Sequence, residues 1–204
     1  MSENLGEFRT LLRVDLGEPT ASRWSDTDLD RHIGHAVRDL NRVAPREMKA
    51  TDLTITDPAS RAIDISSLTD LIAVVAVEYP VGAYPRRMRH FECWGDTLTL
   101  LTDTMPVAGA CINVYYTTPH VVDSEGSTLP SHLEEVSLVG AAGYAALEYA
   151  TCTSDMVNVG ERTPEQFRAF GNDCLMQFRQ ELTALKRERS RALRTGELWT
   201  EDER

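Results

Sequence analysis

The spacing of apolar residues changes twice along the chain, and this change constrains the fold more than any other feature of the sequence. Near both ends, apolar residues recur every three to four positions, which is the period of an α-helix. Between Thr51 and Thr118 they alternate with polar residues instead, which is the period of a β-strand. The order helix, sheet, helix predicts an α+β protein.

Two helices are predicted ahead of the strand-like region. The first covers residues 4–16, and Asn4 is a favourable residue to cap its N-terminus. The second starts after Ser25, because Ser25 and Asp28 have the spacing of a capping box, in which each side chain bonds a backbone N–H of the first turn. This second helix has one apolar stripe and ends before Pro45, because proline disrupts a helix interior.

Five or six short strands are predicted between the two helical parts. Their connections are too short to contain crossover helices, so we expect antiparallel pairing. The segment from Leu71 to Tyr79 is mostly apolar and β-branched, which predicts a strand covered on both faces. The predicted strands are Leu53–Ile55, Ile63–Ile65, Leu71–Tyr79, Phe91–Trp94, Thr97–Leu101 and Ile112–Thr117.

A third helix is predicted to start at Ser131, with Glu134 completing a capping box. Residues 133–151 are apolar nearly all round, so we expect this to be the most buried helix. Gly140 and Gly143 cost roughly 1 kcal/mol each in a helix interior. We interpret both as helix-packing residues, because small side chains let a second helix approach closely.

The last predicted helix starts after Thr163, which forms a third capping box with Gln166. Its end is basic from Lys186 to Arg194. Leu198 and Trp199 follow in an otherwise charged tail, and aromatic residues with arginines are typical of interfaces. We therefore predict a partner-docking site made of Arg187, Arg189, Arg191, Arg194, Leu198 and Trp199.

Together these elements predict a four-helix core with an inserted small antiparallel β region, a long C-terminal helix and an extended tail. The predicted parts are 1–48 and 129–192 for the helical core, 49–128 for the β insertion and 193–204 for the docking tail.

Composition and motifs exclude several classes of function. The formal net charge of −11 argues against nucleic acid as the main partner, because phosphate binding needs positive surface. The sequence has no apolar run of the roughly 20 residues that cross a bilayer, and no signal peptide, so we expect a protein that stays in the cell where it is made and has no membrane partner. It has no nucleophile elbow, no phosphate-binding loop and no Cys-x-x-Cys pair. We expect no enzyme and no cofactor.

One alternative with catalytic chemistry stays open. His32 and His35 are three residues apart on a predicted helix, with Asp28 and Asp39 nearby, so a metal-dependent hydrolase is conceivable. No second helix offers obvious ligands, and we prefer to interpret both as solvated surface histidines. A further alternative is a soluble helical module that binds a partner through the basic end of the last helix.

The ordered series of segments resembles the head-to-tail adaptor (connector) proteins of tailed bacteriophages. The likeness covers most of residues 5–190 and keeps the order helix, β, helix. The segments that carry it are Leu11–Gly17, Arg23–Ile33, Ala36–Leu40, Ile112–His120, Leu129–Pro130 and Gly140–Ala146.

This resemblance implies a virion structural protein that is assembled in the host cytoplasm. Family members form a dodecameric ring beneath the portal protein, join the capsid to the next neck or tail protein, and line part of the channel through which DNA passes. Their last helix and C-terminal segment reach the portal, which here implies residues 167–193 for the helix and 196–204 for the docking tail. The acidic balance is compatible with a channel wall that lets DNA slide.

Overall fold

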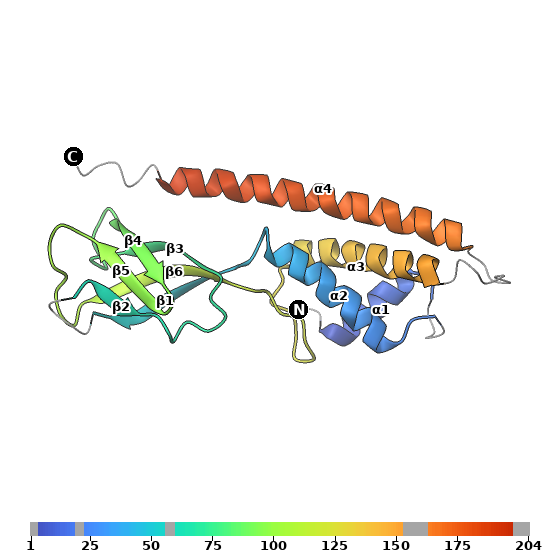
Figure 1. The fold of residues 1–204 in the computed structure, drawn as a ribbon, viewed down its shortest axis with the longest axis horizontal. Helices are drawn as coiled ribbons and strands as arrows, with labels where there is room; N and C mark the ends of the chain where they lie inside the picture. The colour runs from blue at the N-terminus through green and yellow to red at the C-terminus, as the bar shows by residue number, and fades with distance from the viewer. Residues whose placement is uncertain (1–3, 19–22, 56–59, 153–162, 198–204) are drawn as a thin grey trace. The chain divides into compact units, whose positions relative to one another are not determined.

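The structure is a computed structural model that describes residues 4–18, 23–55, 60–152 and 163–197. The chain divides into a helical unit and a sheet unit, with boundaries after Ala44, Pro119 and Arg189 (Figure 1). The helices are α1 (Leu5–Asp15), α2 (Asp26–Asn41), α3 (Ser131–Cys152) and α4 (Pro164–Glu197). The strands are β1 (Arg46–Thr54), β2 (Ala62–Asp64), β3 (Ala73–Glu78), β4 (Met88–Trp94), β5 (Thr97–Leu101) and β6 (Cys111–Thr118).

Local capping sets where the helices begin. Asn4 caps α1 together with Glu7, and Ser25 caps α2 together with Asp28, both as reciprocal capping boxes. These two predicted helix starts are confirmed. The predicted start of α3 at Ser131 is also confirmed, and the carbonyl of the preceding Pro130 accepts the first helical hydrogen bonds from Leu133 and Glu134.

The helical unit has its own hydrophobic core, in which Trp24 is central. The Trp24 ring lies 5.1 Å from the ring of Tyr149 and 5.8 Å from that of Phe167, and its Nε1 donates to the carbonyl of Ala145 at 3.3 Å. Residues just before α2 and at the start of α4 thereby pack against the middle and end of α3. The fully buried members of this core include Phe8, Leu12, Leu29, Ile33, Leu40, Ala141, Ala145 and Phe167.

Charged side chains join α1 to α2. Arg9 donates to both carboxylate oxygens of Asp30, at 2.6 and 2.7 Å. Arg13 is nearly buried and donates from Nη2 to the carbonyl of Trp24 at 3.1 Å and to Asp26 at 2.7 Å. Its Nη1 lies 3.7 Å from the buried carboxylate of Glu18. This arginine therefore joins the end of α1 to the start of α2.

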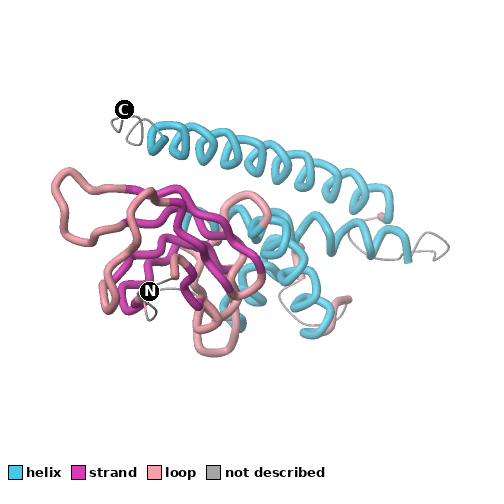
Figure 2. The backbone as a smooth tube through the Cα atoms, turned by 60° about the vertical axis from the view of Figure 1, so that its left-hand side comes forward, coloured by secondary structure: helices cyan, strands magenta, loops and turns pink. Residues whose placement is uncertain are grey.

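The sheet unit is one antiparallel sheet with strand order β1-β6-β3-β4-β5-β2. Its strands are labelled in Figure 1 and drawn in magenta in Figure 2. Its two edge strands, β1 and β2, come close to each other, so the sheet curls into a half-barrel. The concave side holds a second hydrophobic core formed by Ile55, Ile63, Ile65, Val77, Leu98, Leu100, Ile112 and Val114.

The predicted fold class is wrong in its organisation. The protein is α+β, but it is not a helical four-helix core with a small β insertion, because the six-stranded sheet has a core of its own. In addition, among the described side chains of α4, large ones are fully buried at Phe167, Leu175 and Phe178, and Leu182 and Leu185 pack partly buried against the same core. The helical core therefore consists of α1, α2, α3 and the part of α4 from Phe167 to Leu185.

The prediction that residues 71–79 are covered on both faces is also wrong. Ile72 and Val75 are about half and two-fifths exposed, whereas Val77 is fully buried. The half-barrel covers only its concave side, so an apolar strand keeps one face open over part of its length. In the part of the chain that the structure describes, none of the helices combines the length and the apolar character needed to cross a bilayer.

Candidate functional site

The contact between α3 and α4 positions the predicted docking helix. A Cβ atom on Gly140 would lie 3.0 Å from the ring of Phe178, and one on Gly143 would lie 2.8 Å from the side chain of Leu175. A third glycine, Gly171 of α4, lets α3 approach closely in turn, since a Cβ atom on it would lie 2.9 Å from the side chain of Leu147. The structure thus places both predicted packing glycines of α3 directly against α4.

These contacts also define the register of the two helices. Along α3, Gly140, Gly143 and Leu147 contact α4 in that order. Their partners on α4 are Phe178, Leu175 and Gly171, whose numbers fall by the same three and four residues. The helices are therefore antiparallel. In this register Ser131, the first residue of α3, lies at the same height along the helix axes as Arg187. Residues 188–197 continue α4 for roughly 15 Å past the end of α3.

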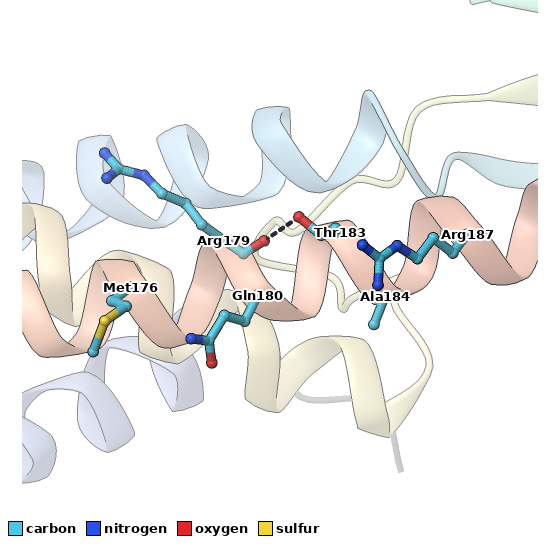
Figure 3. Close-up of a pocket in the computed structure, with 6 residues that line it drawn as sticks. All are labelled: Met176, Arg179, Gln180, Thr183, Ala184 and Arg187. Carbon is cyan, nitrogen blue, oxygen red and sulfur yellow. Dashed lines mark hydrogen bonds between the residues drawn. The ribbon is translucent and has the colours of Figure 1, made fainter.

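The side of α4 that faces away from α3 forms an open groove, shown in Figure 3. Met176 is about half exposed, and the hydroxyl of Thr183 donates to the carbonyl of Arg179 at 2.8 Å. The groove combines two guanidinium groups with apolar and amide side chains, which suits contact with another protein better than catalysis. Its lining residues are Met176, Arg179, Gln180, Thr183, Ala184 and Arg187.

The predicted docking arginines lie in different environments. Arg187 lines the groove, and Arg191 is exposed one turn further on. Arg189 is half-buried and turns back to the helical unit, with Nη1 3.5 Å from the carbonyl of Val43 after α2. Arg189 therefore holds α4 against the end of α2. The side chain of Arg194 and the residues Leu198 and Trp199 lie outside the described part of the chain.

Sequence reasoning missed the groove residues Met176, Arg179, Gln180 and Thr183. The helical period contained a signal for them. The buried residues of α4 recur at three- and four-residue steps, so the positions half a turn away were expected to be exposed. The methionine at position 176, which lies between polar residues on that face, could have indicated this groove.

The histidine pair does not form a metal site. His32 is only 3% exposed, and its Nε2 lies 3.3 Å from a carboxylate oxygen of Glu148, while burial lowers the pKa of its imidazole. His35 is exposed and stacks on Tyr144 with ring centroids 4.1 Å apart. Among the described residues, no three His, Cys, Asp or Glu side chains are grouped to hold a metal ion. The expectation of a solvated surface residue is wrong for His32.

A second polar cluster lies in the sheet unit around the buried carboxylate of Glu78. One of its oxygens accepts a hydrogen bond from Asn113 at 2.8 Å and another from Tyr115 at 3.0 Å. The Asn113 hydrogen bond is the main cause that lowers the pKa of Glu78, and the Tyr115 hydroxyl and the Gly82 amide act in the same direction. All of these groups stabilise the ionised carboxylate, so the cluster joins β3, β6 and the connection after β3.

Acid should destabilise the sheet unit through Glu78. Its pKa is lower in the folded than in the unfolded chain, so its contribution is complete above the unfolded value of about 4.3 and is lost as pH falls through the folded value. We expect wild-type protein to lose more free energy of unfolding between about pH 7 and pH 3 than the Glu78→Gln variant does. Urea unfolding at several pH values measures this, and equal losses would contradict it.

No protein family matches the chain, and no curated protein matches it either.

Proposed function

We propose that this chain is a head-to-tail adaptor (connector) protein of a tailed bacteriophage. In this role it is a virion structural protein that forms a ring beneath the portal, with a dodecamer expected, and joins the capsid to the next neck or tail protein. The proposal combines the resemblance of the sequence with one observation of the structure, the length and exposure of α4.

The helix α4 has 34 residues and is about 50 Å long, whereas α3, which it packs against, has 22. Its apolar stripe covers the part opposite α3, and its last ten residues run past the end of that helix. The first part of α4 is thus fixed on α3, and we call the part beyond that contact, together with the tail that follows it, the docking arm. Its extending end is basic over residues 186–194, which is suited to an acidic partner surface.

The remaining features are compatible with this role. A net charge of −11 disfavours tight contacts with phosphates, so DNA would pass through a channel of such subunits without being held. The convex side of the sheet unit exposes apolar residues, among them Trp94 and Leu101, which is suited to contact with a neighbouring copy or with the tail side of the neck.

Removing residues 193–204 tests the docking arm. We expect the truncated chain to bind portal rings of the same phage at least tenfold more weakly, because it lacks Arg194, Leu198 and Trp199, and a few such residues carry most of the binding energy of an interface. Cosedimentation with portal rings measures the binding, and electron microscopy shows whether a second ring has been added.

Two controls make the result specific. The truncated chain should unfold at the same temperature as the full chain, and the Leu198→Ala/Trp199→Ala variant should lose most of the same binding. Normal loading of the truncated chain would refute the docking arm. A full-length chain that never forms a ring on portals and is absent from virus particles would refute the adaptor function.

A helical binding module is the second candidate, and the groove with Arg179 and Arg187 favours it. In that case a basic face of α4 would bind an acidic partner without any virus particle. Such binding would weaken strongly with added salt and would not depend on the portal.

A further inference from the structure

The helix α4 carries opposite charges on its two flanks. Arg179 and Lys186 are exposed on one flank, and Glu181 and Glu188 are exposed on the other. A separation of two residues corresponds to about 200° around a helix and about 3 Å along it. Each basic residue therefore has an acidic residue at nearly the same height on the opposite side. We call these residues the basic flank and the acidic flank of α4.

Beside the basic flank, Arg42 of α2 forms an ion pair with Asp39 at 3.0 Å, so these two side chains add no net charge to that side. On the basic side, the charge therefore comes from residues of α4 itself.

The acidic flank borders a hollow between α3 and α4. Its rim carries the carboxylates of Glu135 and Glu181, and partly buried Val136 and Val139 contribute apolar surface to it. His132 and Gln177 also line the hollow, so its surface is mixed. Two carboxylates beside apolar side chains are complementary to a helix face with cations and apolar side chains. The opposite side of the same helix has that composition, with Arg179, Lys186 and the exposed Met176.

We propose that a second copy of this chain occupies this hollow, with its basic flank against the acidic flank and with the two α4 helices parallel. The repeat of seven residues between Arg179 and Lys186, and between Glu181 and Glu188, brings both charge pairs together in one register. A two-fold dimer through the basic flank would instead place Arg179 near Lys186, and like charges oppose that arrangement.

Because the two flanks differ, each copy in such a contact offers a free flank to the next copy. The contact is heterologous, and such a contact gives a ring when its rotation closes and an open filament when it does not. This inference rests on the proposed adaptor function and deepens it, since it identifies the partner of each flank as another copy of the chain.

Charge reversal of each flank tests the inference. The Arg179→Glu/Lys186→Glu variant carries two acidic flanks, and the Glu181→Lys/Glu188→Lys variant carries two basic flanks. We expect each variant alone to associate at least tenfold more weakly than wild type, because two attractive pairs become repulsive. Sedimentation velocity over a range of protein concentrations measures the association.

Mixing the two variants provides the decisive readout. Every contact in an alternating assembly would again join an acidic flank to a basic flank, so we expect equimolar mixing to restore association. The chain with all four substitutions should also associate. The control variant Arg46→Glu/Glu125→Lys, which reverses two exposed charges outside α3, α4 and the Trp94 face of the sheet, should associate like wild type. Circular dichroism checks that every variant is folded.

Three results would overturn the inference: a wild-type chain that stays monomeric up to its solubility limit, reversed flanks that leave association unchanged, or a mixture that stays dissociated. They differ from failure of the adaptor function. Rings that form on portals despite reversed flanks would refute this interface and leave the adaptor function standing.

Discussion

Replacing Gly143 by alanine should lower the free energy of unfolding by about 1–3 kcal/mol, although alanine is the better helix former. The new Cβ atom would lie 2.8 Å from the side chain of Leu175 and 3.1 Å from its backbone nitrogen. A side chain can rotate away, but a backbone atom moves only if α4 moves with it. Denaturant unfolding measures the change.

Gly34 of α2 provides the matched control. A Cβ atom there would meet no other atom within 4 Å. Gly34→Ala should therefore stabilise the protein by about 0.5–1 kcal/mol, which is the ordinary gain of alanine over glycine in a helix. If both substitutions stabilised the protein to the same extent, α3 and α4 would not be in the close contact described here.

Replacing Arg13 by alanine should cost about 3 kcal/mol of stability. The guanidinium bonds the carbonyl of Trp24 and the carboxylate of Asp26, and it lies 3.7 Å from the carboxylate of Glu18, which is only 3% exposed. Removing one partner of a buried ion pair leaves the other charge poorly compensated. Because Asp26 is largely exposed, we expect the lower end of the range known for buried pairs.

Arg42 is the control for this prediction. Its pair with Asp39 is similar in distance, at 3.0 Å, but its side chain is 79% exposed. Arg42→Ala should cost less than about 1 kcal/mol, as exposed ion pairs do. Thermal or denaturant unfolding of both variants gives the comparison. Equal costs would mean that burial of Arg13 has no part in holding α1 to α2.

The sequence predicted best what depends on neighbours three or four residues away. The starts of α1 and α2 follow from capping boxes at Asn4 and Ser25, whose two partners are three positions apart and need nothing else. The box at Thr163 forms in the same way, with its backbone N–H bonded by Gln166 at 2.9 Å. The buried stripe of α4 also follows from its period alone.

Features that depend on distant pairing were predicted less well. The strand β1 starts at Arg46, ahead of the predicted Leu53, because its polar first residues pair with Tyr115 to Thr118 of β6. Nothing local in Arg46–Lys49 indicates a strand. His32 was expected in solvent, but α3 covers that part of α2, and this burial lowers the pKa of the imidazole.

The candidate site on α4 also has features that depend on local sequence and features that depend on distant contacts. The sequence alone determined that the last helix is long, amphipathic and basic at its end, because period and charge are properties of a single segment. Only the tertiary structure decided that Gly140 and Gly143 hold this helix in one antiparallel register. That register selects which of its residues are covered, and it leaves a basic flank and an acidic flank on opposite sides. Burial depends on which surfaces meet, and surfaces from segments far apart in the chain meet only once it has folded.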